Sequence, residues 1–116
     1  MKFTDTLKKN YEFQRLYSKG KSVVTPHLVV YVRKTRKPCN RIGITVSTKL
    51  GKAHVRNRVR RRLREIYRLN EEAFIQGLEM VTVARVKAVK ASYRQLEHSF
   101  MSACGKLGVL KEQSEG

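Results

Sequence analysis

Residues 53–73 read AHVRNRVRRRLREIYRLNEEA, and this stretch decides the fold. Its apolar side chains recur four, four and three residues apart, which is the spacing of one face of an α-helix. This apolar stripe consists of Val55, Val59, Leu63 and Ile66. At about 100° per residue, the side of the helix away from the stripe carries mainly arginine. Its polar residues are Arg56, Asn57, Arg60, Arg61, Arg64 and Arg68. The stretch therefore predicts an amphipathic helix that packs through one side and presents guanidinium groups on the other.

The charge around this helix is one-sided. Six of the nine residues 56–64 are arginine, and no acidic side chain occurs between Glu12 and Glu65. That window of 52 residues holds sixteen of the chain's 26 lysines and arginines. Like charges repel and destabilise a compact state, and a merely solvated surface intersperses both signs. The block therefore predicts a polyanionic partner, and a phosphate backbone is the obvious one.

The overall composition is that of one small basic domain. The chain has 116 residues and 13.5 kDa, and 41% of its residues are hydrophobic, which is enough for a core. Its net charge of +17 and pI of about 10.5 are typical of a nucleic-acid-binding domain. No apolar run is long enough to span a membrane, and the first residues do not resemble a signal peptide. We therefore expect a cytoplasmic protein.

Alternating patterns before the basic helix predict two strands. In residues 27–33 every second side chain is apolar, with Leu28, Val30 and Val32 on one side. Residues 41–47 alternate in the same way, and a basic turn that contains Pro38 separates the two segments. Two strands joined by such a turn predict an antiparallel pair.

Three further segments complete the predicted fold. They are a helix from Asn10 to Ser18, a strand from Leu78 to Val86, and a closing helix that begins with the capping box of Ser92 and Gln95 and ends near Gly105 or Gly108. The predicted order is αββαβα. It corresponds to a single, sandwich-like α+β domain over residues 1–116, in which helices pack a small sheet. Residues from about 109 to 116 are expected to form a flexible C-terminal tail.

The chain has no set of residues suited to catalysis of its own. Its three histidines lie apart from any Cys, Asp or Glu at ligand spacing: His27, His54 and His98. Cys39 and Cys104 are single cysteines, which we expect to be free thiols without a chemical role. Neither a phosphate-binding glycine loop nor a nucleophile elbow occurs. We predict no catalytic residue, no metal ligand and no cofactor bound by the protein alone, so binding is the expected function.

The basic and aromatic residues favour RNA over duplex DNA. Arginine predominates in the block, and its planar guanidinium suits phosphate contacts and base stacking. Phe13, Tyr17 and Tyr31 could provide a stacking surface for unpaired bases. The spacing of Phe13 and Tyr17 taken alone favours the buried stripe of an amphipathic helix, and both interpretations stay open for those two residues. Tyr31 lies on the side of its strand opposite the apolar residues.

One segment resembles the signature of bacterial ribonuclease P protein subunits. Residues 41–64 read RIGITVSTKLGKAHVRNRVRRRLR, in which a strand, a lysine-glycine turn and an Arg-Asn-Arg motif follow in order. Residues 10–17, NYEFQRLY, are similar to the first helix of that family, and residues 81–85, VTVAR, to its third strand. The resemblance covers nearly the whole chain. Thr48 stands where the family more often has lysine.

The resemblance implies a function. In this family a catalytic RNA performs metal-dependent hydrolysis that removes the 5′ leader from precursor tRNA. The protein binds the leader, aids metal and substrate affinity and broadens the substrate range, while the RNA holds most of the Mg2+. By position, Phe13, Tyr17 and Tyr31 correspond to the leader cleft. The residues that correspond to the basic RNA-binding motif are Lys49, Arg56, Asn57, Arg58, Arg60, Arg61 and Arg64. The family also implies a left-handed β-α-β crossover. From the charge of the chain alone, we expect polyanions to stabilise the fold.

Two other functions remain compatible with the composition. A ribosomal or ribosome-assembly protein would share the size, the charge and the preference for RNA. A DNA-binding basic helix is the second alternative, although no heptad repeat follows the arginines to form a dimer. The ordered signature of residues 41–64 favours the ribonuclease P interpretation over both.

Overall fold

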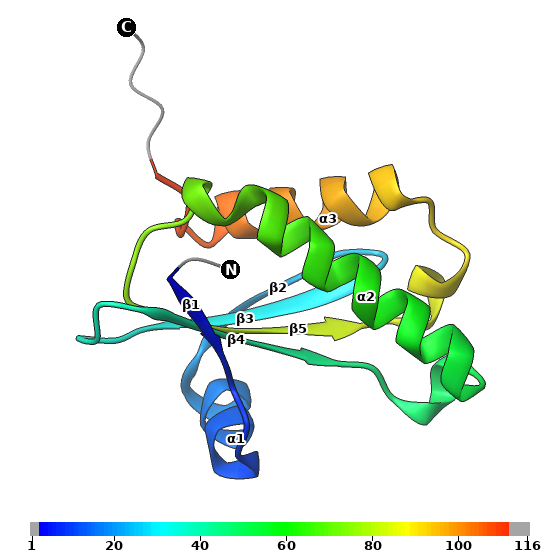
Figure 1. The fold of residues 1–116 in the computed structure, drawn as a ribbon, viewed down its shortest axis with the longest axis horizontal. Helices are drawn as coiled ribbons and strands as arrows, with labels where there is room; N and C mark the ends of the chain where they lie inside the picture. The colour runs from blue at the N-terminus through cyan, green and yellow to red at the C-terminus, as the bar shows by residue number, and fades with distance from the viewer. Residues whose placement is uncertain (1–2, 112–116) are drawn as a thin grey trace, which may run out of the picture.

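A five-stranded sheet separates two layers of helix, with α1 on one face and α2 and α3 on the other (Figure 1). The computed structural model describes residues 3–111 of the chain. The elements follow in the order β1 (Thr4–Thr6), α1 (Asn10–Lys19), β2 (Lys21–Val24), β3 (Leu28–Lys34), β4 (Asn40–Thr45), η1 (Thr48–Leu50), α2 (Ala53–Asn70), η2 (Glu71–Ala73), β5 (Leu78–Ala84), η3 (Val86–Val89) and α3 (Tyr93–Lys106), where η marks a short 3₁₀ turn. The predicted α+β class is confirmed.

The order of strands in the sheet is β1-β4-β5-β3-β2. Strand β5 pairs in parallel with β4 and antiparallel with β3. The prediction that β3 and β4 form a direct antiparallel pair is therefore wrong, because β5 lies between them. The physical reason is the burial of β5, in which every residue except Val83 is buried. A strand that is apolar on both faces is stable only in the middle of a sheet that both layers cover.

Two strands lie outside the predicted pattern. Strand β1 pairs in parallel with β4, and β2 forms an antiparallel hairpin with β3. Neither carries the alternation that identified β3, since β1 reads TDT and β2 reads KSVV. The parallel strands β4 and β5 are joined by α2, which is the β-α-β crossover that such a pair requires. The left-handed sense of this crossover stays a prediction.

The main core lies between the sheet and the layer of α2 and α3. Most of the predicted inward-facing residues contribute to it: Leu28, Val30, Val32, Ile42, Val46, Val59, Leu63, Ile66, Leu96, Phe100 and Cys104 are all buried. Val55, at the exposed start of α2, is only half-buried and lies outside this core, so its predicted place in the packed stripe is wrong. A second, smaller cluster under α1 is formed by Leu7, Leu16 and Val81. The two clusters occupy opposite faces of the sheet, so α1 can cover one face without disturbing the main core.

The packed chain extends beyond the predicted start of the C-terminal tail. Val109 is fully buried, and the backbone N–H of Lys111 donates a hydrogen bond to the carbonyl of Ala73 at 2.7 Å. Residues 109–111 are therefore ordered by contacts with the segment after α2, and the prediction of a tail from 109 is wrong for them. The rest of the predicted tail, 112–116, lies outside the described residues.

Candidate nucleic-acid interface

Three aromatic side chains, Phe13, Tyr17 and Tyr31, lie between α1 and the sheet, and Phe13 also lines a pocket. We call this group the aromatic cleft. All three side chains are half-buried and pack against the small cluster under α1. The rings of Tyr17 and Tyr31 meet edge to face, with centroids 5.1 Å apart and planes at 72°. The Tyr17 hydroxyl and Thr45 Oγ1 share a hydrogen bond of 2.8 Å, which fixes the ring against β4. The structure thus brings the three predicted aromatic residues together, with part of each ring still accessible.

The Phe13 ring occupies the space that a side chain at Gly43 of β4 would fill. A Cβ at this position would lie 2.6 Å from Cε1 and 2.7 Å from Cζ of Phe13. Real Cβ atoms do not approach other atoms this closely, so a larger residue would displace the ring. The absence of a side chain at Gly43 therefore determines how deeply Phe13 sits in the aromatic cleft.

A pocket of about 210 Å³ connects the aromatic cleft to the basic helix. Its walls come from the N-terminal segment, from Phe13 on α1, from β4 around Gly43, and from Arg60 and Arg64 on α2. Arg60 Nη1 donates a hydrogen bond to Asn57 Oδ1 at 3.1 Å. This bond orients the Arg60 guanidinium along the helix. One cavity thus combines an aromatic ring with two guanidinium groups. This combination suits a nucleotide, which has a base to stack and a phosphate to bind.

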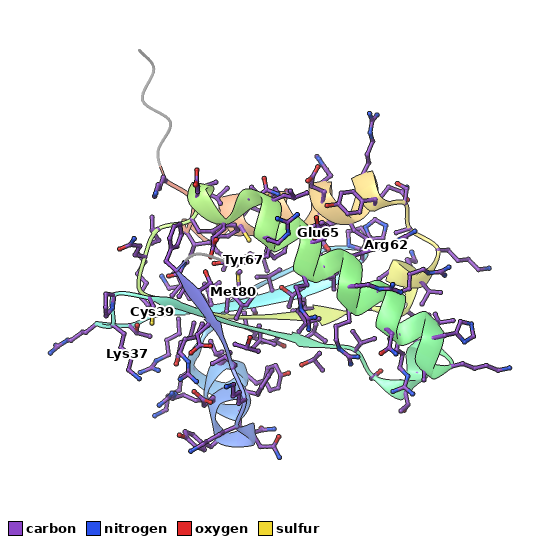
Figure 2. All side chains as sticks on the ribbon, in the orientation of Figure 1. Lys37, Cys39, Arg62, Glu65, Tyr67 and Met80 are labelled. Atoms are coloured by element: carbon purple, nitrogen blue, oxygen red, sulfur yellow. The ribbon has the colours of Figure 1, made fainter. Side chains whose placement is uncertain are left out.

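The arginines of α2 face two different sides of the molecule. Arg60 and Arg64 line the pocket at Phe13, whereas Arg58, Arg61 and Arg62 line a groove of about 440 Å³ beside α3. Figure 2 shows Arg62 on α2 close to Glu65, which also lines that groove. Helical geometry explains the division. Each residue of an α-helix is rotated by about 100° from the one before, so side chains two positions apart, such as Arg60 and Arg62, point about 160° away from each other. Sequence analysis identified a basic face but not its division between two cavities.

The start of α2 presents the Arg-Asn-Arg motif to solvent. Lys49, Asn57 and Arg58 are exposed, and Arg56 is half-buried. Gly51 has φ of 125°, a conformation that favours glycine, and its carbonyl accepts a hydrogen bond from Arg56 Nε at 3.2 Å. The turn therefore anchors the first arginine of the motif. The other donors of the motif remain available for a ligand.

Two buried glutamates organise further arginines at this interface. Glu79 Oε1 accepts a hydrogen bond from Arg33 at 3.0 Å, and its Oε2 contacts Arg15 at 3.4 Å. Glu12 forms a second ion pair with Arg41. Register explains the arrangement, because Glu79 is the cross-strand partner of both Arg33 and Arg41. Sequence reasoning missed this network, since only the pairing of β5 with both neighbours brings the charges together.

The carboxylate of Glu12 is held in its ionised form. Burial would by itself raise the pKa of Glu12, but hydrogen bonds from the backbone N–H groups of Lys9 and Lys8 and the nearby charge of Arg41 outweigh it. The net result is a pKa below the ordinary value of 4.5. Glu12 therefore joins the start of α1 to β4 with a charge that persists in mildly acidic solution.

Neither cysteine lines the pocket at Phe13 or the groove beside α3. Cys39 and Cys104 are free thiols, as predicted, and burial raises the pKa of Cys104 to about 12. Figure 2 shows Cys39 with Lys37 at the β3–β4 turn, at the end of the molecule away from Arg62. Within residues 3–111, no group of three or more His, Cys, Asp or Glu side chains could hold a metal ion. In the same part of the chain, no helix is long and apolar enough to cross a membrane.

Comparison with known proteins places the chain in one family. Residues 1–108 match the profile of the family Ribonuclease P. The ribonuclease P protein component of Alkaliphilus oremlandii is 39% identical over 110 residues, which cover 95% of this chain and 96% of the relative. That of Clostridioides difficile is 42% identical over 97 residues, covering 83% of this chain and 85% of the relative.

Solved structures agree with the sequence comparisons. The RNase P protein of Staphylococcus aureus superposes with a TM-score of 0.84 at 32% identity, covering 91% of this chain and 97% of that one. The RNase P protein from Thermotoga maritima gives a TM-score of 0.77 at 28% identity, covering 84% and 93%. These likenesses do not favour the alternative of a ribosomal protein. The chain therefore belongs to the ribonuclease P family, as a protein subunit of the endoribonuclease that processes the 5′ ends of tRNAs.

Proposed function

We propose that the chain binds the 5′ leader of precursor tRNA in the aromatic cleft. The observation that carries this proposal is the pocket in which Phe13 meets Arg60 and Arg64. A leader is single-stranded, so its bases can stack on Phe13, Tyr17 and Tyr31 while its phosphates contact the guanidinium groups of α2. Phe13, Tyr17 and Tyr31 all pack against the cluster under α1, so one extended strand would contact all three rings.

The catalytic RNA is the partner of the basic motif at the start of α2 in this proposal. Lys49 and Arg56 lie at the turn around Gly51, and Asn57 and Arg58 follow Arg56 in α2. None of the four lines the pocket at Phe13. Arg61, at the outer side of α2, extends the same cationic surface. The two flanks of α2 would then contact two RNAs, so the helix would align the leader with the RNA that cleaves it.

Hydrolysis itself belongs to the RNA in this proposal. The side chains at the interface are mainly guanidinium groups, which have no lone pair to offer a metal ion and repel cations. These residues do not fit as ligands of the Mg2+ that the family implies. The protein instead lowers the repulsion between RNA phosphates, so that less Mg2+ is needed to hold the assembly together.

The test is reconstitution of cleavage from purified parts. We expect the protein to stimulate removal of the leader from precursor tRNA by a bacterial ribonuclease P RNA at low Mg2+. Protein without RNA should leave the precursor intact. Cleavage by RNA-free protein that follows the protein through purification would contradict the proposed role as an accessory subunit. Selective recovery of ribosomal RNA from cells would contradict the choice of partner.

A further inference from the structure

A second basic groove lies on the face of the sheet that α2 and α3 cover. It consists of two adjoining cavities of about 490 Å³ and 470 Å³, which share His27 and Gln95 as lining residues. We call it the His27 groove. None of its lining residues belongs to the pocket at Phe13, and α1 lies on the other face of the sheet (Figure 1). The groove is thus separate from the proposed leader cleft.

The charge of the His27 groove is entirely positive. Lys87 and Lys90 line the first cavity, and Arg94 and Lys106 line the second. No carboxylate lines either cavity within the described part of the chain. The glutamates that precede and follow Lys87 and Lys90 in the sequence, Glu79 and Glu97, line neither cavity. Four cations without a counter-charge around one groove favour the binding of an anionic ligand.

The walls of the groove suit nucleobases. Leu50 and Val86 contribute apolar surface to the first cavity, and the Val86 side chain is 61% exposed. The ring of His27 lines both cavities, and its Nδ1 is held 2.7 Å from the hydroxyl of the buried Ser99. A fixed imidazole ring with apolar surface beside it can stack an unpaired base, and the lysines and arginine can bind its phosphates.

The position of the groove indicates which RNA it binds. Leu50 ends η1, whose Lys49 belongs to the basic motif that we assign to the catalytic RNA. The first cavity thus begins beside that motif, so one RNA strand could contact both, whereas a leader on α1 would have to pass around the sheet. We infer that the His27 groove binds a single-stranded segment of the catalytic RNA. This inference rests on the proposed function.

The sharpest test is the substitution Gln95→Glu. Gln95 lines both cavities, and its Oε1 accepts the N–H of Ser92 at 2.8 Å in the capping box of α3. Glutamate fits the same capping box, so the fold is retained while a negative charge enters the groove. The matched control is Gln76→Glu, an exposed position outside both cavities.

We expect Gln95→Glu to weaken assembly with the catalytic RNA by about tenfold, the lower end for one charge-assisted contact. Gln76→Glu should match the wild type, and circular dichroism should show both variants folded. Equal affinities for the two variants would overturn the inference. A loss confined to leader-bearing precursor, with assembly unchanged, would also overturn it, because the occupant would then be the substrate.

A salt titration provides an independent readout. The double variant Lys87→Gln, Lys90→Gln should reduce the slope of log affinity against log salt by about 1.4, which is about 0.7 for each lost contact with single-stranded phosphate. The control Lys34→Gln, Lys37→Gln has the same charge but alters the far end of β3, beside the β3–β4 turn. Equal slopes for the two double variants would overturn the inference. Failure of the wild-type protein to bind the RNA at all would instead contradict the proposed function.

Discussion

The Phe13 ring lies where a side chain at Gly43 would be, with Cε1 only 2.6 Å from the Cβ position of that glycine. We therefore predict that Gly43→Ala forces the ring out of its place in the aromatic cleft. The added methyl group should lower the free energy of unfolding by about 1–3 kcal/mol, the usual cost of overpacking. It should also weaken the binding of leader-bearing precursor. Denaturant unfolding and precursor-binding titrations measure the two effects.

Gly105→Ala is the control for this substitution. A Cβ at Gly105 would meet only Leu110 Cδ1, at the ordinary distance of 3.9 Å, and the residue lies inside α3. Alanine there should stabilise the helix by up to about 1 kcal/mol and leave RNA binding unchanged. Equal precursor affinity for Gly43→Ala and Gly105→Ala would show that the position of Phe13 is irrelevant to leader binding.

Alanine at each residue of the aromatic cleft should reduce the affinity for precursor tRNA. We expect a loss of about 1–3 kcal/mol each for Phe13→Ala, Tyr17→Ala and Tyr31→Ala, the range for stacking of one base. Mature tRNA, which has no leader, should bind almost as before. The variant Tyr17→Phe removes only the hydrogen bond to Thr45 and should retain most of the affinity. Equal losses for precursor and mature tRNA would assign these rings to the packing of α1 instead.

Removal of the basic motif should raise the Mg2+ requirement of the holoenzyme. In the triple variant Arg56→Ala, Asn57→Ala, Arg58→Ala, the loss of cations leaves more phosphate repulsion for metal ions to offset. We expect weaker assembly with the catalytic RNA and a higher Mg2+ midpoint in cleavage assays. Cleavage at saturating Mg2+ should recover. A Mg2+ midpoint equal to that of the wild type would argue against a contact between this motif and the RNA.

Polyanions should order the isolated protein. A net charge of +17 opposes folding through self-repulsion, and a domain of this size has little stability in reserve. Sulfate, pyrophosphate or nucleotides that bind only the folded protein should stabilise it, by about 2.7 kcal/mol at one hundred times the dissociation constant. Chloride at matched ionic strength should stabilise the folded protein less, because it screens charges without bridging several donors.

Cys104 reports this ordering directly. It is buried in the main core, 4.0 Å from Met80 Sδ, so a thiol reagent reaches it only when the protein unfolds. We expect its labelling to be fast at low ionic strength and slow in sulfate, in parallel with far-ultraviolet circular dichroism. A fully folded spectrum and the same slow labelling in every anion would show that the protein folds without a bound polyanion despite its net charge.

Acid should destabilise the fold partly through Glu12. The folded-state pKa of Glu12 lies below its ordinary value of 4.5, so its stabilising contribution is present above that pH and is lost as the pH falls through the folded value. The variant Glu12→Gln should therefore show a shallower loss of unfolding free energy below pH 4.5. The comparison is Glu65→Gln, because the hydrogen bond from Arg68 also lowers the pKa of Glu65, but this pair is exposed and screened by solvent. Its effect on the slope should therefore be smaller than that of Glu12→Gln. Identical acid profiles for Glu12→Gln and wild type would exclude the contribution of Glu12.

Local patterns explain which parts of the structure were predictable. The alternation of Leu28, Val30 and Val32 and the spacing of Val59 and Leu63 reflect short-range geometry, so sequence analysis placed β3 and α2 correctly. The pairing of the sheet depends on contacts between distant segments, and neither β3 nor β4 contains a signal that β5 will lie between them.

The same limit applies to the candidate interface. Phe13 and Tyr17 pack on the α1 cluster, as a helix stripe would, and are still partly accessible, while base stacking by their rings stays a prediction. The ion pairs of Glu79 with Arg15 and Arg33 had no local signature at all. They exist because three segments far apart in the chain meet at one register of the sheet.

The central place of β5 has a consequence for synthesis on the ribosome. Without residues 78–84, the sheet consists of two separate halves, β1 with β4 and β2 with β3. Each half leaves an unpaired, apolar strand edge, which favours aggregation. A nascent chain therefore gains its sheet only after most of the arginines have emerged and met cellular RNA. The basic segment that binds RNA in the finished protein would thus also keep the unfinished chain in solution.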